Sequence, residues 1–462
     1  MPGHKTKTAR GIAAEVLCEV KLRKKFAGRI LDGYTQLIER QRATDLVFGV
    51  MRNHSVIDLI IEKVSACPIA RVHDKVLNII RVGVYEIIYC PETAEYAIVN
   101  EAVDSVKKIA GARQSGFVNA VLRRTLRHIS NRQIRLEQAP PSKTIPQTAD
   151  TGCEFDIEIL PDSNASISRY LSSVFSLPGW LVKSWLDEYG REQTEKICFA
   201  SNRRPSVYLR PNPQRTTIDE LTGKLRAGGV DCQVTGRPQM IKLTSPKAIT
   251  ALPGFDGGLF TVQDLSAAEA IGLLKPQPGW TILDLCAAPG TKTTQLAEAT
   301  AGWAKISATD IDSSRLDMVR ENVARLGLAD CVTVIEYNAV YEWAKKFGGF
   351  DCILVDAPCS NTGVLARRPE VRLRITKKAV GELAKTQLEL LSKVIFLLKS
   401  RGFICYSTCS IQPQENGLLI RGFIQRHPEF KLKSEKLVLP SAQPFDCDGA
   451  YAAVIAKQSS AG

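Results

Sequence analysis

Two cysteines and an aspartate stand at the ends of two predicted strands, in the segments Asp356-Ala-Pro-Cys359 and Ser407-Thr-Cys409. The carboxyl ends of neighbouring parallel strands meet at one edge of a sheet, so we expect these side chains to converge there. A thiolate is a strong nucleophile and a workable leaving group, which suits a covalent intermediate that must later break down. An arbitrary cysteine is usually a small buried hydrophobe. Two cysteines facing one crevice favour chemistry over packing.

The stretch TILDLCAAPGTKTT, residues 281–294, has the pattern of a nucleoside-binding turn. Its apolar start predicts a buried strand, its small residues and Gly290 predict a tight turn, and a helix can begin at Thr291. Such a turn brings backbone N–H groups against a polar ligand. Asp310 follows Gly290 by twenty residues. It ends the next predicted strand, where an acidic residue of a Rossmann-like fold meets a ribose diol.

Spacing excludes several other kinds of site. A dinucleotide site requires G-x-G-x-x-G, and this turn has one glycine; a P-loop requires Gly-Lys, and Gly290 is followed by Thr291. Histidine-based acid–base chemistry is not expected, because His427 is the only histidine after residue 128. The thirteen cysteines form no CxxC pair and do not alternate with histidine at zinc-ligand spacing. We therefore expect no metal, and free thiols in a reducing cytoplasm.

The elements that must position these residues form the last part of the chain, residues 255–462. Strands alternate there with helices, which specifies a largely parallel sheet with helices on both faces. Strands are predicted at 281–285, 305–309, 332–336, 352–356, 402–407 and 451–456. Helices are predicted at 291–299, 313–326, 377–399 and 414–426. The unusual polar residues all follow predicted strands, where ligands bind in such sheets.

Three further segments precede this part. Residues 1–135 are predicted to be an all-helical bundle, because apolar residues recur at helical spacing and proline is almost absent. Residues 136–165 are rich in proline and polar groups and are predicted to be a linker. Residues 166–254 mix helices with short strands, which predicts a small α+β subdomain of a kind that often handles RNA.

The net charge of +13 is unevenly distributed along the 462 residues. Residues 1–135 hold 23 Lys and Arg against 13 Asp and Glu. This surplus favours RNA or DNA as a partner. The sequence contains no run of about 18 apolar residues, so no membrane span is expected. The N-terminus also lacks the apolar core of a signal peptide. For the basic clusters at 21–25 and 116–132, a solvated face and a phosphate-binding surface stay equally open.

The motifs resemble those of the NOL1/NOP2/Sun class of RNA cytosine-5 methyltransferases, which use S-adenosylmethionine. The matching segments are DLCAAPG at 284–290, DIDSSRL at 310–316, DAPCSNTG at 356–363 and YSTCSIQPQEN at 406–416, with the lead-in segments VYLRPN at 207–212 and FTVQD at 260–264. Near the N-terminus, YAIVNE at 96–101 and FVNAVLRR at 117–124 are similar to the RNA-binding fold of the antitermination factor NusB. This pairing is typical of the Sun/Fmu type of 16S ribosomal RNA methyltransferase.

The resemblance implies a NusB-like bundle at 1–135 and a Rossmann-like S-adenosylmethionine-dependent methyltransferase at 255–462. It implies that Cys409 adds to C6 of a cytosine, that Cys359 assists proton removal and enzyme release, and that Asp356 hydrogen-bonds N3 and the exocyclic amine. The target base must leave its stack to reach such a site. The implied partner is 16S ribosomal RNA or an early small-subunit particle, and a cytoplasmic monomer is expected.

The resemblance also assigns a cofactor-binding set. It comprises Cys286, Ala287, Ala288, Pro289, Gly290, Thr291, Lys292, Asp310, Asn338 and Asp356. Asn338 stands where the family usually has an aspartate near the adenine, and Thr291 replaces a frequent second glycine. Residues 368–373, RPEVRL, depart from a common His-Pro-Asp…Trp pattern. That departure concerns RNA recognition more than methyl transfer.

Two other functions stay open. One is the same chemistry on tRNA or another RNA, because phosphate contacts carry no sequence information. The other is a catalytically degenerate RNA-binding protein of ribosome assembly, against which the retention of Cys359, Cys409 and Asp356 argues. An adenine-N6 methyltransferase would have an Asn/Asp-Pro-Pro-aromatic turn after the fourth strand, and the chain has Asp356-Ala-Pro-Cys359 instead.

Overall fold

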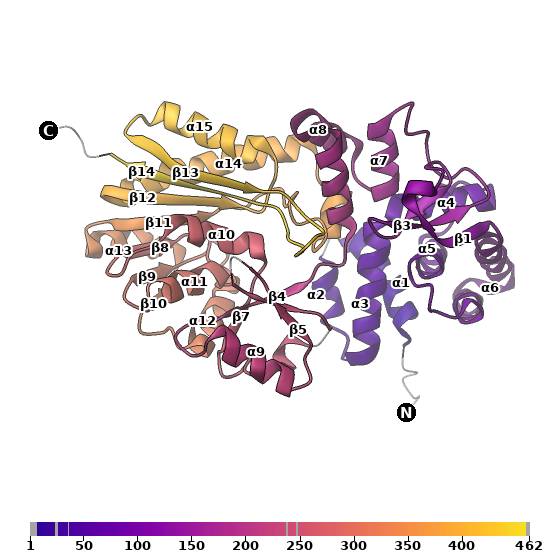
Figure 1. Cartoon of the computed structure of the whole chain (residues 1–462), viewed down its shortest axis with the longest axis horizontal. Helices are drawn as coiled ribbons and strands as arrows, with labels where there is room; N and C mark the ends of the chain where they lie inside the picture. The colour runs from indigo at the N-terminus through magenta and orange to yellow at the C-terminus, as the bar shows by residue number, and fades with distance from the viewer. Residues whose placement is uncertain (1–6, 24–25, 36, 237–238, 246–247, 459–462) are drawn as a thin grey trace. The chain divides into compact units, whose positions relative to one another are not determined.

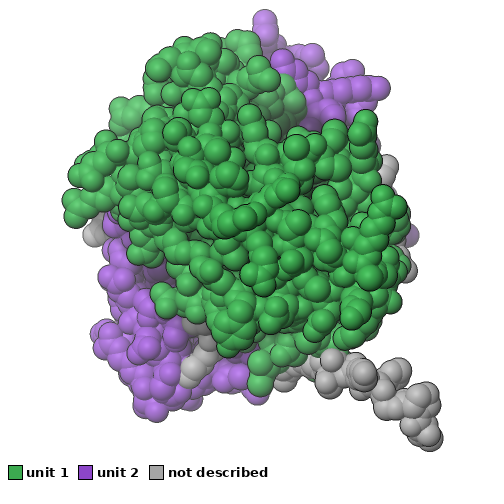
Figure 2. Space-filling view, turned by 90° about the vertical axis from the view of Figure 1, so that its right-hand side faces the viewer, with its two compact units in different colours: residues 1–203, 368–374 green, residues 204–367, 375–462 purple. Residues whose placement is uncertain are grey.

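The computed structural model divides into two compact units, which Figure 2 distinguishes by colour. Unit 1 comprises residues 1–203 and 368–374, and unit 2 comprises residues 204–367 and 375–462. The structure describes residues 7–23, 26–35, 37–236, 239–245 and 248–458. Two residues of the basic cluster at 21–25, Lys24 and Lys25, lie outside the described residues.

Unit 1 begins with six helices, which confirms the helical bundle predicted there. Figure 1 shows them in the indigo and purple part of the chain: α1 (Ala9–Arg23), α2 (Ala27–Leu31), α3 (Leu37–Arg52), α4 (His54–Ser65), α5 (Asp74–Tyr89) and α6 (Glu95–Arg127). The apolar residues at helical spacing are buried, among them Ile12, Val16, Ile57 and Ile80. The helix α6 is broken at Gly111, whose φ of 81° is a conformation that glycine adopts readily.

The segment predicted to be a linker contains strands instead. A three-stranded antiparallel sheet has the order β1-β3-β2 and consists of β1 (Ile129–Arg135), β2 (Thr144–Pro146) and β3 (Thr151–Phe155). Ile145, Cys153 and Phe155 are buried, so the sheet has an apolar side despite the prolines around it. Strands of three and five residues are too short for a period-2 pattern to stand out. The first of them also ends the all-helical region before residue 135.

Two more helices and a distant segment complete unit 1. The helices are α7 (Ile167–Phe175) and α8 (Gly179–Asn202), within the predicted α+β subdomain. The segment 368–374, which departs from the family pattern, also belongs to this unit and contains the short 3-10 helix η6 (Pro369–Leu373). Arg372 of η6 is buried and donates hydrogen bonds to the carbonyl oxygens of Arg52 and Phe175.

Unit 2 begins with a four-stranded antiparallel sheet in the order β5-β6-β4-β7. Its elements are β4 (Val207–Pro211), α9 (Ile218–Ala227), β5 (Cys232–Val234), β6 (Ile241–Leu243) and β7 (Phe260–Val262). Leu209, Leu225 and Phe260 share one core with the helix. Because β7 pairs with β4, the sheet takes a strand from beyond residue 254, where composition places a domain boundary.

The second sheet of unit 2 has seven strands in the order β10-β9-β8-β11-β12-β14-β13. They are β8 (Thr281–Asp284), β9 (Lys305–Ala308), β10 (Val332–Val334), β11 (Phe350–Asp356), β12 (Leu398–Thr408), β13 (Phe430–Val438) and β14 (Ala450–Lys457). The first five in this order are parallel, and β14 runs antiparallel to both of its neighbours. From β8 the chain builds one half of the sheet and then returns to build the other from β11. Ligands bind where the strand order reverses in this way.

Helices cover both faces of this sheet, as the alternation of elements predicts. They are α10 (Leu265–Leu274), α11 (Thr291–Ala299), α12 (Leu316–Leu326), α13 (Val340–Phe347), α14 (Lys377–Val394) and α15 (Gly417–Arg426). The helices α10, α11 and α12 pack on one face, and α13, α14 and α15 pack on the other (Figure 1). Side chains of a strand alternate between faces, so Ile282 and Leu283 enter different cores.

All six predicted strands of this sheet are present, and β13 is one that the sequence pattern does not predict. It lies at the edge of the sheet and reads FKLKSEKLV. Charged residues are common on edge strands, where they oppose pairing with other chains, and here they hide the strand pattern. The helix predicted at 377–399 ends at Val394, and β12 begins at Leu398, four residues before its predicted start.

Candidate active site

Five strands of the larger sheet bring the predicted site residues to one edge. Across the sheet, β10 leads to Asn338, β9 to Asp310, β8 to the turn 286–292, β11 to the segment 356–359, and β12 to Cys409. The strands β11 and β12 are in register, with Asp356 opposite Ser407. The two cysteine-bearing loops therefore begin side by side, next to the point between β8 and β11 where the strand order reverses.

The sulfur atoms of the two cysteines face each other. Cys359 Sγ and Cys409 Sγ are 3.1 Å apart, and both residues are free thiols. Cys359 is buried, whereas Cys409 is partly exposed. Asn361 contacts both loops: its Oδ1 lies 3.3 Å from Cys409 Sγ, and its Nδ2 donates to the Cys359 carbonyl at 2.8 Å. The hydrogen bond with Cys409 and burial raise the pKa of the Cys359 thiol well above its ordinary value.

A lysine and a serine bind the carboxylate of Asp356. Lys292 Nζ lies 2.7 Å from Oδ2, and Ser407 Oγ donates to Oδ1 at 2.5 Å. Burial opposes the charge of Lys292, but the negative groups around it, Asp356 foremost, leave its pKa raised. About a third of the Asp356 side chain is exposed, so the carboxylate can still accept from a ligand. The pair joins the turn after β8 to the end of β11.

The turn after β8 has the backbone geometry of a ligand-binding loop. Gly290 precedes α11 with a φ of 101°, which disfavours any residue with a side chain. The N–H of Ala287 donates to the Thr309 carbonyl at 2.8 Å, which fixes the turn against the end of β9. The N–H of Ala288 donates to Asp310 Oδ2 at 3.2 Å. The turn 286–292, which is predicted to bind the cofactor, and Asp310, the predicted ribose acceptor, are therefore held together.

Asp284, at the end of β8, carries a buried acceptor with no described partner. Its side chain is fully buried, and Thr293 Oγ1 donates to Oδ2 at 2.7 Å. Oδ1 accepts no hydrogen bond from the described residues. Burial raises the pKa of this carboxyl to about 7. A buried polar atom without a partner is costly, and a cationic ligand group in the turn would satisfy it.

The other predicted cofactor residues differ in their surroundings. Cys286 is partly buried and packs against the core, and burial raises the pKa of its thiol. Asn338 is exposed, in the short 3-10 helix η5 (Tyr337–Ala339) after the edge strand β10. Lys292, predicted to contact the cofactor, binds Asp356 in the structure.

Sequence reasoning missed Glu415 as a site residue. Glu415 is fully buried and accepts hydrogen bonds from Ser360, Ser410 and Gln387. One signal could have found it: Glu415 is the only charged residue between positions 402 and 420. A glutamate is almost never fully buried unless it is paired, so a lone carboxylate in an uncharged stretch is a candidate for a role.

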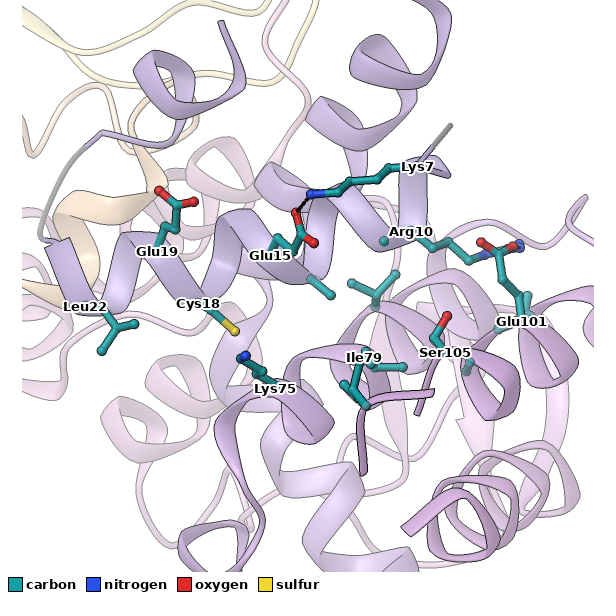
Figure 3. A pocket seen from close by; sticks show the side chains of 17 residues that line it. Lys7, Arg10, Glu15, Cys18, Glu19, Leu22, Lys75, Ile79, Glu101 and Ser105 are labelled. Atoms are coloured by element: carbon teal, nitrogen blue, oxygen red, sulfur yellow. Dashed lines mark hydrogen bonds and ion pairs between the residues drawn. The ribbon is translucent and has the colours of Figure 1, made fainter. Parts of the chain in front are cut away.

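A separate cavity of about 490 Å³ lies in unit 1, among α1, α5 and α6 (Figure 3). Two ion pairs line the cavity, Lys7 with Glu15 and Arg10 with Glu101. Ile79 contributes an apolar part of the lining. None of the predicted site residues lines it. Within the described residues, every helix is too short or too polar to span a membrane, and no cluster of metal-binding side chains is present.

Comparison with known families matches three parts of the chain. Residues 271–452 match the family described as 16S rRNA methyltransferase RsmB/F. Residues 7–127 match the NusB family, and residues 177–250 match the ferredoxin-like domain of RsmF/B-like methyltransferases.

Individual proteins resemble the chain over most of its length. The Ribosomal RNA small subunit methyltransferase B of Escherichia coli O127:H6 is 34% identical over 432 residues, which cover 93% of this chain and 92% of that protein. The crystal structure of PH0851 superposes with a TM-score of 0.71 at 23% identity and covers 98% of this chain and all of the other. NSun6 from Pyrococcus horikoshii, solved with SFG, has a TM-score of 0.54 at 20% identity and covers 61% of this chain and 99% of its own. At these identities the two structures establish the fold alone.

Proposed function

Because the chain belongs to the RsmB/F family of small-subunit ribosomal RNA methyltransferases, we propose that it methylates C5 of a cytosine in 16S ribosomal RNA through a covalent adduct. One observation carries the proposal: the sulfur atoms of Cys359 and Cys409 lie 3.1 Å apart at the ends of adjacent strands. Methylation of a base nitrogen or of a ribose hydroxyl needs no paired thiols. Methylation at C5 needs one sulfur that adds to the ring. It also benefits from a second group that helps the first sulfur to leave the ring.

Cys409 is the proposed nucleophile. C5 of cytosine is a poor nucleophile, and addition of the Cys409 thiolate to C6 moves the electrons of the C5–C6 double bond toward C5. Cys409 is the more exposed of the two cysteines and is accessible to an unstacked base. In its thiol form, Cys409 donates to Asn361 Oδ1, which orients the sulfur before the proton leaves.

Cys359 is proposed to assist the second half of the reaction. After C5 has been methylated, Cys359 gives its thiol proton to the departing Cys409 sulfur and, as the thiolate left behind, accepts the proton from C5. The bond from C6 to Cys409 breaks and the C5–C6 double bond re-forms. The raised pKa of Cys359 keeps its thiol protonated, so it does not compete as a nucleophile. A proton shared between the two sulfurs would also stabilise the departing Cys409 thiolate.

Asp356 and Lys292 are proposed to bind the polar edge of the base. With Lys292 beside it, Asp356 acts as a carboxylate and accepts from the exocyclic amine. The Lys292 ammonium balances the negative charge that develops at N3 when sulfur adds to C6. The pair thus stabilises the negative charge of the ring while the C5–C6 bond is saturated.

The proposed methyl donor is S-adenosylmethionine, and the turn after β8 has suitable groups for it. The predicted contacts are Cys286 to Lys292, Asp310, Asn338 and Asp356. The unpartnered Oδ1 of Asp284 suits the cationic ammonium of the methionine part, and Asp310 suits the ribose diol. When bound, S-adenosylmethionine supplies an electrophilic methyl group to C5. The match of residues 271–452 to a methyltransferase family supports this cofactor class.

The substrate is proposed to be 16S ribosomal RNA or an early small-subunit particle, as the name of the Escherichia coli relative implies. The basic surplus of the N-terminal residues and the NusB match over 7–127 support an RNA partner. Action as a monomer in the cytoplasm completes the proposal.

The proposal is tested with RNA that carries 5-fluorocytosine. Fluorine at C5 cannot leave as a proton does, so wild-type protein with S-adenosylmethionine should form an adduct that survives denaturation. Cys409→Ser should form none. An adduct with Cys409→Ser would disprove the assignment of the nucleophile, and no adduct with wild-type protein on any RNA would favour a non-catalytic RNA-binding protein.

Bisulfite mapping of total RNA identifies the substrate. Cells that lack the protein should lose a 5-methylcytosine from 16S ribosomal RNA. Loss from tRNA alone would keep the chemistry and overturn the proposed substrate.

A further inference from the structure

A single buried carboxylate connects the two cysteine-bearing loops. Glu415 Oε1 accepts from the N–H of Ser360 at 2.8 Å, and Oε2 accepts from the hydroxyls of Ser360 and Ser410. Gln387 Nε2, on α14, donates to Oε1 at 3.0 Å. Glu415 itself is fully buried in the 3-10 helix η8 (Pro413–Glu415). Both carboxylate oxygens are thus fully engaged.

The two serines follow the two cysteines directly in the sequence. Ser360 is bonded to Cys359, and Ser410 is bonded to Cys409. Their hydroxyls lie 3.1 Å apart and meet at the same carboxylate oxygen. Because each serine is one residue from its cysteine, fixing the serines fixes the backbone from which both sulfurs project. The 3.1 Å spacing of the sulfurs therefore depends on a bridge whose centre is Glu415.

The surroundings of Glu415 distinguish it from an ordinary buried ion pair. The hydrogen bonds described for its carboxylate come from an amide N–H, two hydroxyls and a side-chain amide, all neutral groups. An ionised carboxylate is costly to bury without a cation, and several hydrogen bonds offset that cost. Its negative charge is also among the causes that raise the pKa of Cys359.

We infer that Glu415 is a positioning residue of the reaction, which holds Cys359 and Cys409 at the spacing that adduct formation and release require. The inference rests on the proposed function. Glu415 itself is separated from the sulfurs by the two serines and acts through them. A misplacement of about 1 Å at a reacting group can cost about 10²-fold in rate.

The first test measures the spacing of the sulfurs without the reaction. Diamide oxidises two neighbouring thiols to a disulfide and is itself reduced to the hydrazine, and peptide mapping by mass spectrometry then quantifies the Cys359–Cys409 disulfide. Wild-type protein should form it readily. Glu415→Ala and Glu415→Gln should form it at least about tenfold more slowly, because the effective concentration of one thiol at the other falls. Glu389→Gln, at an exposed position on α14, should match wild type.

The second test measures steady-state kinetics with RNA and S-adenosylmethionine. Glu415→Gln should lower kcat by about 10-fold to 10²-fold. KM for S-adenosylmethionine should stay within about twofold, because no cofactor residue is changed. Ser410→Ala removes one arm of the bridge and should lower kcat less than Glu415→Gln does. A residue that merely stabilised the fold would lower the melting temperature and leave kcat of the folded fraction unchanged.

The outcomes separate this inference from the proposed function. Wild-type disulfide rates and wild-type kcat in Glu415→Gln would overturn the inference, whatever the reaction is. If Glu415→Ala fails to fold, Glu415→Gln and Ser410→Ala decide, since both keep the site filled. Failure of wild-type protein to trap 5-fluorocytosine RNA would overturn the proposed function, while the disulfide rates would still decide whether Glu415 sets the spacing.

Discussion

Lys292 Nζ lies 2.7 Å from Asp356 Oδ2, and this pair joins the turn 286–292, the predicted cofactor-binding turn, to the end of the strand that leads to Cys359. The side chain of Lys292 is mostly buried and that of Asp356 is about one-third exposed. Lys292 lies in the first turn of α11, which follows β8, and Asp356 ends β11; the order of strands reverses between β8 and β11. The pair thus places one positive and one negative group where the methyl donor and the base are proposed to meet.

Lys292→Met should lower kcat by about 10²-fold, the scale for loss of one donor that stabilises developing charge. Methionine keeps the length of the side chain and removes the ammonium, so Asp356 loses its cation. The 5-fluorocytosine adduct should also form more slowly. Lys305→Met, at an exposed position of β9, is the matched control and should leave both rates unchanged. Wild-type kcat in Lys292→Met would remove Lys292 from the mechanism.

Cys359→Ser should accumulate a covalent adduct with ordinary RNA, because the step that releases Cys409 is impaired. Serine keeps the size of the side chain but is a far weaker proton donor to a departing thiolate. Denaturing gels of protein mixed with labelled RNA and S-adenosylmethionine would measure the adduct. Rapid turnover by this variant, without a trapped species, would contradict the role proposed for Cys359.

Asp284 should make stability fall as pH rises. Its folded-state pKa is raised from 3.8 to about 7, so the folded protein binds the proton more tightly than the unfolded chain does. Between these two values the free energy of unfolding loses up to about 1.4 kcal/mol per pH unit from this group. In urea denaturation without S-adenosylmethionine, the free energy of unfolding of Asp284→Asn should rise relative to that of wild type as the pH increases from 3.8 to about 7. A pH-independent difference would show that Asp284 is not the titrating group.

Arg210→Lys should weaken both stability and cofactor binding. Arg210, on β4, is buried, binds both oxygens of Glu298, and donates to the Thr291 carbonyl at the start of α11. Lysine cannot make this bidentate contact with the carboxylate. Loss of a charged hydrogen bond lowers the free energy of unfolding by roughly 2 kcal/mol. Urea denaturation and calorimetric titration with S-adenosylmethionine would measure the two effects.

The exposed pair of Arg320 with Asp317 on α12 provides the control for Arg210. Arg320→Lys should change the free energy of unfolding by less than about 0.5 kcal/mol, because exposed ion pairs contribute little. Equal effects of the two substitutions would show that the small sheet does not support the cofactor turn.

Arg123 and Arg127 should contribute to RNA affinity through phosphate contacts. Both lie exposed at the end of α6, and the double change to Gln removes two positive charges. The slope of log affinity against log salt concentration should fall by about 1.4 for single-stranded RNA. The matched control is Lys345→Gln with Lys378→Gln, which removes two exposed charges from unit 2. An unchanged slope would show that the end of α6 is only a solvated surface.

Much of the fold could be predicted because its signals are local. Apolar residues such as Ile57 and Ile60 repeat at helical spacing, and Ile282, Leu283 and Leu285 cluster at the strand that starts at Thr281. The segment 136–165 and β13 were not predictable in this way. Prolines mask the short strands of the first, and lysines mask the alternating pattern of the second. The sheet that includes β7 likewise crosses a boundary that composition suggests.

The features of the site also divide into those that the sequence predicts and those that it does not. The order of the residues in the sequence, with one polar cluster after each strand, was enough to predict that Cys359 and Cys409 converge, since parallel strands end at one edge. The sequence could not predict the 3.1 Å spacing of the two sulfurs, the partner of Lys292 or the burial of Glu415. Each of these depends on contacts between side chains that are some fifty or more residues apart in the sequence. Residue types determine which chemistry is available, since they set nucleophilicity and charge. Tertiary packing alone decides which groups share one solvent-poor volume, where distances of a few ångströms set both pKa and reactivity.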